Sequence, residues 1–137
     1  MFEFTIKYLG FLKFVPLLPQ FFDAFVRMHT FIFKKEVMVY TDEIEQAVLS
    51  WKGTSLKTHR YGGIQFEVNG KEIGHIHSNG LLDILFKKNI REQLIREGRA
   101  IQHHTFEKSG WISLYIRTEA DKKNALELLE YSYLLKS

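Results

Sequence analysis

The sequence predicts a single α+β domain built on a mainly antiparallel sheet, and three observations lead to this prediction. Short runs of alternating apolar and polar residues, separated by turn residues, recur between residues 64 and 117. Apolar residues at helical spacing precede and follow these runs. The connections are short, and 137 residues are enough to bury one hydrophobic core. We therefore expect about five to six strands with a β-hairpin, packed by two to three helices and preceded by an apolar N-terminal helical segment.

Local signals place the elements along the chain. Thr41, followed by two acidic residues, predicts a capped helix start, and Gly53 ends that helix. Thr118 and Asp121 have the spacing of a capping box and predict the start of the last helix. The buried stripe of the last helix is predicted as Ala125, Leu128, Leu129 and Ser132. The other predicted elements are strands at Leu81–Phe86, Ile101–Phe106 and Trp111–Arg117 and a helix at residues 88–97.

The clearest local signal is the Asn69-Gly70 pair between two extended runs. Both residues readily adopt positive φ, as a two-residue type I′ hairpin turn requires. The register continued from this turn pairs Val68 with Lys71, Phe66 with Ile73 and Ile64 with His75. Because side chains alternate along a strand, we expect His75 and His77 on the apolar, core-facing side of the sheet, together with Phe66.

The chain divides into an apolar helical segment, residues 1–35, and one α+β domain, residues 36–137. The segment holds most of the 12 phenylalanines, but charges and two prolines interrupt it before the roughly 20 apolar residues that span a bilayer. Two interpretations stay open. The segment forms short helices packed on the domain or on a second copy in a homo-oligomer, or residues 1–33 lie at a membrane surface with Lys7 and Lys13 at the headgroups. A disordered tail is disfavoured, because many large apolar side chains would face water.

Charge and composition exclude several classes of function. The net charge of +3 comes from 19 basic and 16 acidic residues that are interspersed, which disfavours a dedicated nucleic-acid surface. Cysteine is absent, which excludes disulfides, thiolate nucleophiles and Cys-ligated metal. No dinucleotide, P-loop, nucleophile-elbow or H-E-x-x-H motif occurs, which argues against nucleotide, phosphoryl and common hydrolase chemistry. No secretory signal is evident, so we expect a cytoplasmic protein, with peripheral membrane contact through residues 1–33 as the open variant.

Histidines supply the candidate chemistry. Five of the six lie at predicted strands or strand ends, and the H-x-H pair, His75 and His77, places two imidazoles on one face. Only one ring of the adjacent pair, His103 and His104, can point inward. The candidate catalytic residues are His75, His77, Asp83, His103 and His104, with Arg60 as an anion contact and Phe66 and Trp111 as walls of a substrate site. Asp83 is either a general base or the group that orients a histidine.

A functional pocket and a set of core histidines bonded to backbone or to Asp83 both account for the H-x-H pair. We predict no metal and no cofactor, because H-x-H without a spaced third ligand is a signal of low specificity. If the protein is an enzyme, its chemistry is acid–base chemistry by histidines.

The order of motifs resembles the luciferase-domain family, a group of small bacterial and fungal proteins. The resemblance covers residues 41–135. It rests on G-G-x-x-F at residues 62–66, E-I-G-H-x-H at residues 72–77, the single acid Asp83 in the next strand, H-H at residues 103–104 and S-G-W at residues 109–111. The family includes a fungal luciferase that oxidises a hispidin-type luciferin with molecular oxygen. Membership of the family does not imply luminescence. The resemblance implies an α+β fold and a small-molecule function.

Two functions therefore stay open. The first is a luciferase-domain-like protein that binds a small aromatic or enolic molecule in a histidine-lined pocket, as a cofactor-independent oxygenase would. The second is a non-catalytic binding module for nucleic acid or a protein partner, in which the histidines are structural. The order of elements also resembles small double-winged DNA-binding proteins, at the level of fold only.

Overall fold

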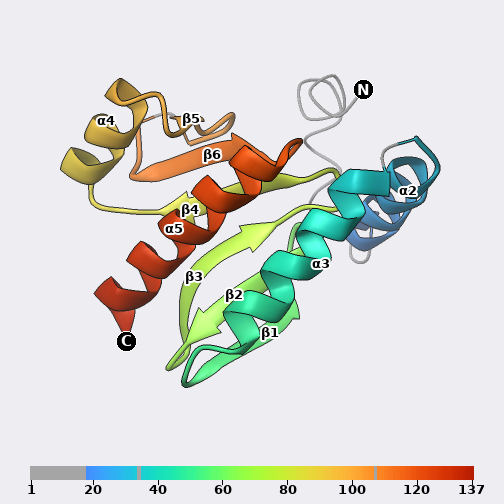
Figure 1. Ribbon diagram of the computed structural model, residues 1–137, viewed down its shortest axis with the longest axis horizontal. Coiled ribbons are helices and arrows are strands. Elements are labelled where there is room, and N and C mark those ends of the chain that lie inside the picture. The colour runs from blue at the N-terminus through green and yellow to red at the C-terminus, as the bar shows by residue number, and fades with distance from the viewer. Residues whose placement is uncertain (1–17, 34, 107) are drawn as a thin grey trace.

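The computed structural model describes residues 18–33, 35–106 and 108–137. Four helices and six strands follow one another in these residues (Figure 1). They are α2 (Leu18–Phe33), α3 (Lys35–Leu49), β1 (Thr54–Thr58), β2 (Ile64–Val68), β3 (Lys71–Ile76), β4 (Leu81–Leu85), α4 (Lys88–Arg96), β5 (Ile101–Gln102), β6 (Trp111–Tyr115) and α5 (Glu119–Lys136). The predicted α+β fold is confirmed.

The six strands form one sheet in the order β1-β2-β3-β4-β6-β5, and each neighbouring pair is antiparallel. Helices α3 and α5 lie side by side across one face of this sheet, while α4 lies at its β5–β6 end (Figure 1). A Cβ added at Gly74 of β3 would meet the Leu129 side chain of α5 at 3.2 Å, so this residue marks the helix-covered face. We call it the helix face and the opposite side the outer face.

The hydrophobic core lies between the helix face and the two helices. The predicted stripe of α5 is confirmed, since all four of its residues are buried. The capping box is confirmed as well: the Thr118 hydroxyl accepts from the Asp121 N–H at 3.2 Å, and Asp121 Oδ2 accepts from the Thr118 N–H at 2.9 Å. The fully buried core side chains include Ile44, Val48, Phe66, Ile73, Leu82, Ile84, Ile112, Ile116, Leu128 and Leu129.

The predicted start of the first domain helix is wrong. Helix α3 begins at Lys35, and Thr41 lies buried inside it with its hydroxyl donating to the Met38 carbonyl at 2.9 Å. The reason is tertiary: the buried residues Val37, Thr41, Ile44 and Val48 form one stripe, so packing extends the helix past its local cap signal. The helix also ends at Leu49, and the following strand β1 had no counterpart among the predicted elements.

The predicted strands and helix later in the chain are present in the structure. Strands β5 and β6 are shorter than predicted. Strand β5 covers two residues instead of Ile101–Phe106, and β6 ends at Tyr115 instead of Arg117. The Asn69-Gly70 turn is confirmed, because both residues have positive φ, 52° and 75°, and Val68 pairs with Lys71.

The register beyond this turn differs from the predicted one. A β-bulge interrupts the pairing opposite Phe66 and Glu67, and Ile73 is the extra residue on β3. The observed pairs are Phe66 with Gly74, Gln65 with His75 and Ile64 with Ile76. The bulge is fixed to the core, because the Ser132 hydroxyl of α5 donates to the Ile73 carbonyl at 2.7 Å.

The described part of the N-terminal segment is α2, which packs against α3 and against the loop after β3. The Ser78 hydroxyl donates to Asp23 Oδ2 at 2.9 Å, and Val26 is buried. Phe21 and Met28 remain 72% and 55% exposed. Within the described ranges, no helix has the length and apolar character needed to cross a membrane. The predictions for residues 1–17 lie outside the described residues.

Candidate histidine–aspartate site

A row of buried polar residues crosses the outer face of the sheet. In the strand register, Gln65 of β2 is opposite His75 of β3, His75 is opposite Asp83 of β4, and Asp83 is opposite Ser113 of β6. Directly opposed residues of antiparallel strands share a face. All four are buried, although polar residues of this kind are usually exposed. The row therefore needs an account beyond packing.

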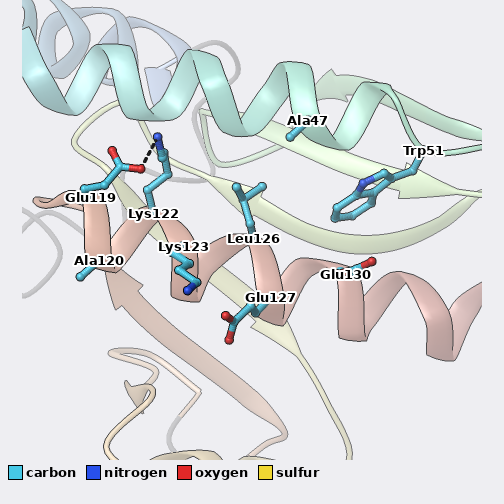
Figure 2. Close-up of a pocket in the computed structure, with 9 residues that line it drawn as sticks. All are labelled: Ala47, Trp51, Glu119, Ala120, Lys122, Lys123, Leu126, Glu127 and Glu130. Carbon is cyan, nitrogen blue, oxygen red and sulfur yellow. Dashed lines mark ion pairs between the residues drawn. The ribbon is translucent and has the colours of Figure 1, made fainter.

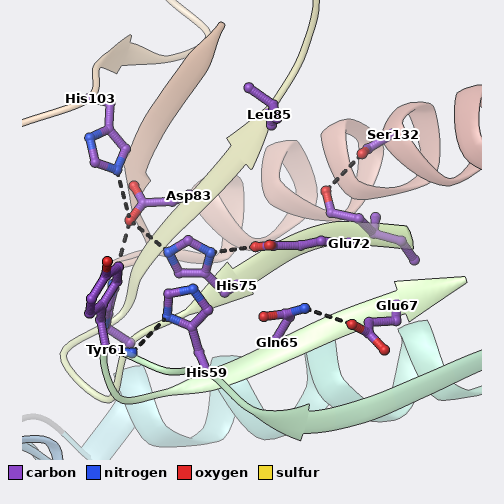
Figure 3. A network of polar contacts seen from close by, with 12 residues as sticks. His59, Tyr61, Gln65, Glu67, Glu72, His75, Asp83, Leu85, His103 and Ser132 are labelled. Atoms are coloured by element: carbon purple, nitrogen blue, oxygen red, sulfur yellow. Dashed lines mark hydrogen bonds and ion pairs between the residues drawn. The ribbon is translucent and has the colours of Figure 1, made fainter. Parts of the chain in front are cut away.

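Asp83 is the centre of the row and is fully buried. One carboxylate oxygen, Oδ1, accepts a short hydrogen bond from the Ser113 hydroxyl. The other, Oδ2, has no hydrogen-bond partner in the described structure. Three imidazole Nε2 atoms surround Oδ2, those of His75, His77 and His103, at 3.4, 3.5 and 3.6 Å. Figure 3 shows His75 and His103 directed at Asp83. These distances exceed the usual 2.7–3.2 Å of an N–H···O bond, so the three rings face a common point without closing on it.

His75 is held on every side. Its Nδ1 lies 2.6 Å from Glu72 Oε1, a hydrogen-bond distance (Figure 3). The His59 ring stacks on it with 3.8 Å between centroids and 8° between planes, and Trp111 meets it edge-on at 5.3 Å. A carboxylate bonded to Nδ1 fixes the proton on that nitrogen and directs Nε2 toward Asp83.

The bulge at Ile73 explains how Glu72 and His75 come together. Residues three apart in a regular strand point to opposite faces. The extra residue lets Glu72 reach His75 on the outer face, while Ile73 is buried in the core. The prediction that His75 and His77 lie on the core-facing side with Phe66 is therefore wrong. Phe66 pairs with Gly74 on the helix face and is buried in the core, so it forms no wall of this cluster.

Burial and neighbouring charges set the protonation of the cluster. Burial by itself lowers the pKa of His75, but the Asp83 carboxylate beside Nε2 and the Glu72 carboxylate bonded to Nδ1 outweigh it and raise the pKa to about 9. Burial would raise the pKa of the Asp83 carboxyl, but the histidines and Ser113 hold it well below its usual range. The pKa of Glu72 is lowered in the same way: its bond to His75 outweighs burial. At neutral pH a positively charged His75 thus lies between two carboxylates.

The structure places His103 inward and His104 outward. His103 is 4% exposed, whereas His104 is exposed and stacks on it with 4.3 Å between centroids. His103 Nδ1 accepts the backbone N–H groups of Thr105 and Phe106 at 3.0 and 3.2 Å. Because Nδ1 accepts, the proton of the neutral ring is on Nε2, which faces Asp83. Burial, opposed in part by Asp83, lowers the pKa of His103 to about 4, so the ring is neutral at pH 7.

The loop between β1 and β2 brings His59 over His75. Gly63 in this loop has φ +85°, and a Cβ at this position would lie 2.3 Å from the Ile76 carbonyl oxygen, so only glycine lets the loop approach β3 this closely. Burial, followed by the charge of His75, lowers the pKa of His59 to about 4. Arg60 lies over the Tyr61 ring at 4.6 Å, at the exposed rim of the cluster.

The predicted site residues thus divide clearly. The structure brings together His75, His77, Asp83, His103 and Trp111, leaves Arg60 and His104 at the rim and puts Phe66 elsewhere. Sequence reasoning did not select Glu72, His59, Gln65 or Ser113. His59 carried a weak signal as a histidine at a strand end. Glu72 carried only its place in the E-I-G-H-x-H motif, because regular alternation placed it on the face opposite His75.

A hollow large enough for a small molecule lies away from this cluster. It has a volume of about 650 Å³ and lies between α3 and α5, with Trp51, Lys122 and Leu126 among its lining residues (Figure 2). A cavity of about 10 Å³, room for a single water, adjoins His77. A molecule that reaches the cluster therefore approaches over the outer face, where His77 and Trp111 are partly exposed.

The donor atoms of the cluster are of the kinds that bind metal ions. Imidazole nitrogens and carboxylate oxygens together suit first-row transition metals. Three sets of residues each bring one donor atom per residue within 4.8 Å of the others: His59 with Glu72 and His75, His75 with His77 and Asp83, and Asp83 with His103 and His104.

Comparison with known proteins adds one finding. A family model described as Luciferase domain matches residues 70–132, a stretch that holds every member of the cluster except His59 and Gln65. Neither the comparison with curated proteins nor the comparison with solved structures found a match.

Proposed function

We propose that this chain, which matches the Luciferase domain model over residues 70–132, binds a small planar enolic or phenolic molecule over its histidine–aspartate cluster and ionises it there. The observation that carries this proposal is Asp83. Its carboxylate is fully buried, and Oδ2 faces three imidazoles without a hydrogen bond. Such an arrangement costs stability, and clusters of this kind occur preferentially at functional sites.

The ligand lies on the outer face, against the rings that border the cluster. Trp111 is within van der Waals reach of both His75 and His103, with ring centroids 5.3 and 5.8 Å away, and offers a flat apolar wall. The His77 side chain is 11% exposed, more than those of His75, His103 and Asp83. A ligand hydroxyl approaching from this side meets His77 first.

Two donors of the cluster favour the ionised ligand, the protonated His75 ring and the Nε2–H of His103. An enol or phenol that gives up its proton to the His77 imidazole carries a negative oxygen, and these donors stabilise that oxygen more than they stabilise the neutral hydroxyl. An enolate is also the electron-rich form that molecular oxygen attacks. The same bound state therefore serves an oxygenase that needs no organic cofactor, in which oxygen adds to a carbon of the ionised ligand.

Absorbance and thermal shift test this proposal together. The full chain is titrated with 4-hydroxy-2-pyrones and catechols and with their methyl ethers, which cannot ionise. We expect a rise in melting temperature and a shift of the ligand spectrum to that of its anion, for the hydroxyl compounds only. Asp83→Asn and His77→Gln should weaken binding at least about tenfold, because Asp83 keeps His75 protonated and His77 is the group that meets the ligand hydroxyl. His29→Gln, at an exposed position of α2, is the matched control and should keep both the thermal shift and the spectral change.

Two results contradict the proposal. One is that no hydroxypyrone or catechol changes the melting temperature or the spectrum of the wild-type protein. The other is that Asp83→Asn binds the ligand as well as the wild type does. If duplex DNA binds instead, with affinity that falls steeply between low and moderate salt, the non-catalytic binding module is the better account. Oxygen uptake with each bound ligand then tests the oxygenase step separately.

A further inference from the structure

We infer that His75, His77 and Asp83 form a binding site for a divalent transition-metal ion, and that Zn²⁺ fits its geometry best. The H-x-H pair alone did not predict a metal, because the third ligand comes from a different strand. The register that places His75 of β3 opposite Asp83 of β4 supplies that ligand. The three donor atoms, one from each residue, lie within 4.8 Å of one another.

Two of the three separations between donor atoms match a tetrahedral ion. Two ligands about 2.1 Å from a tetrahedral Zn²⁺ lie about 3.4 Å apart. Asp83 Oδ2 lies 3.4 Å from His75 Nε2 and 3.5 Å from His77 Nε2. Neighbouring ligands of an octahedral ion with bonds of about 2.1 Å lie closer, about 3.0 Å apart. Both separations from Asp83 Oδ2 therefore suit a tetrahedral ion, and the two imidazole donors lie within 4.8 Å of each other.

An independent observation points to a ligand at the same place. Asp83 Oδ2 belongs to a side chain that is 1% exposed, and it has no hydrogen-bond partner in the described structure. Buried polar atoms are almost always paired, so an unpaired carboxylate oxygen among imidazole nitrogens calls for a cation. His75 is also prepared to coordinate, because Glu72 holds its Nδ1 at 2.6 Å. This is the carboxylate–histidine arrangement that orients Nε2 toward a metal.

His103 is a neighbour of the ion and not a fourth ligand. Its Nδ1 accepts two backbone N–H groups, so its Nε2 carries a proton and cannot coordinate. The protein thus supplies two histidines and one carboxylate, and the fourth position stays open. Three protein ligands with an open fourth position are the mark of catalytic rather than structural zinc sites. The His103 N–H faces that side of the cluster and is suited to hold an oxygen bound to the ion.

This inference concerns the same cluster as the proposed function but does not depend on it. When bound, a metal ion supplies a Lewis acid that lowers the pKa of a hydroxyl group at its open position. It then holds the positive charge beside Asp83 that the proton on His75 holds in its absence. Metal binding can be measured without any organic ligand, so either proposal can fail while the other stands.

The test is metal binding by the full, tag-free chain. The protein is stripped with EDTA, dialysed, reloaded with Zn²⁺ or Co²⁺ and assayed by elemental analysis and by the visible absorption of tetrahedral Co²⁺. We expect about one ion per chain and a melting temperature that rises with Zn²⁺. His77→Gln and Asp83→Asn should weaken binding at least about 100-fold, and Glu72→Gln about 10- to 100-fold.

His29→Gln is the matched control and should keep the ion. His103→Gln tests the ligand set: it leaves all three ligands in place, so it should weaken binding far less than His77→Gln does. Far-UV circular dichroism checks that each variant folds, and His77→Gln, at the partly exposed edge of the cluster, serves if Asp83→Asn does not. The inference is overturned if the wild-type protein holds well under one ion and shows no tetrahedral Co²⁺ spectrum. It is also overturned if His77→Gln and Asp83→Asn bind as the wild type does, or if His103→Gln alone abolishes binding.

Discussion

The two faces of the sheet bury side chains of opposite character, although neighbouring residues of the same strands supply both. On β4, Leu82 and Ile84 face the helices and Asp83 between them faces outward, and all three are fully buried. Burial on the helix face removes apolar surface from water and stabilises the fold by roughly 1.5–3 kcal/mol for each large side chain. Burial on the outer face places a carboxylate where charge is costly.

The two faces therefore have different roles. The helix face provides the hydrophobic core of the fold. The outer face adds ionisable groups that weaken the fold unless each has its partner. Buried ionisable groups of this kind occur preferentially at functional sites. Substitutions and changes of pH should therefore affect the free energy of unfolding differently on the two faces.

The largest effect is expected for Phe66→Ala on the helix face. Removing a fully buried ring from the core should lower the free energy of unfolding by about 3–5 kcal/mol, measured by urea denaturation. The adjacent Gln65→Ala on the outer face is the comparison. It removes one hydrogen bond to Glu67, of 2.7 Å, and should cost about 1 kcal/mol. Equal losses in the two variants would contradict the assignment of faces.

The pH dependence of stability comes next and belongs to the outer face. In metal-free protein the pKa of His75 is about 9, against about 6.5 for an unperturbed histidine. The folded state therefore holds this proton more tightly, so the stabilisation is complete below pH 6.5 and is lost as the pH rises to about 9. The loss amounts to on the order of 3 kcal/mol. Urea denaturation at several pH values measures it.

The other histidines act in a different pH window. His59 and His103, whose pKa values are lowered to about 4, stay neutral in the folded state and take up protons on unfolding as the pH falls below 6.5. Stability should therefore also fall between pH 6.5 and 4. Other titratable groups lie near these histidines: Glu72, Asp83, His77 and Lys136. Each variant differs from the wild type at one histidine only, so these groups are the same in every comparison. His75→Gln should remove most of the loss of stability between pH 6.5 and 9, and an unchanged loss would falsify its assignment to the His75 proton.

Gly63→Ala should have an intermediate effect on both stability and site. The new Cβ would sit at positive φ and 2.3 Å from the Ile76 carbonyl, so we expect a loss of about 2 kcal/mol. Because the loop must shift, His59 should also leave its stack on His75, and NMR titration of the His59 ring should show a pKa closer to 6.5. Gly70→Ala is the control, since Gly70 also has positive φ but no atom lies within 4 Å of its added Cβ.

Thr118→Ala should have the smallest of these effects on the free energy of unfolding. It removes the side-chain half of the α5 capping box, at a cost of about 1 kcal/mol in urea denaturation. Ligand and metal binding should not change, because the cap lies at the start of α5 and its bonds are made within residues 117–121. A change in either would mean that the two faces are coupled more closely than their separation by the sheet suggests.

Much of the fold was predictable because its signals are local. The capping box at Thr118, the Asn69-Gly70 turn and the stripe of α5 depend on residues within a few positions of one another, and each is confirmed. The start of α3 was not predictable in this way. Thr41 carries a good cap signal, but burial of Val37 and Thr41 on the same stripe as Ile44 prevails over it.

The candidate site was predictable in composition and not in geometry. The sequence by itself determined which chemistry is available: histidines, one isolated aspartate and a tryptophan, with no cysteine. Only the tertiary structure decided which face they occupy and which residues join them. One extra residue at Ile73 shifts the strand register, turns His75 to the outer face and brings Glu72 to its side. A bulge depends on contacts across strands and with α5, and alternation along a single strand cannot reveal it.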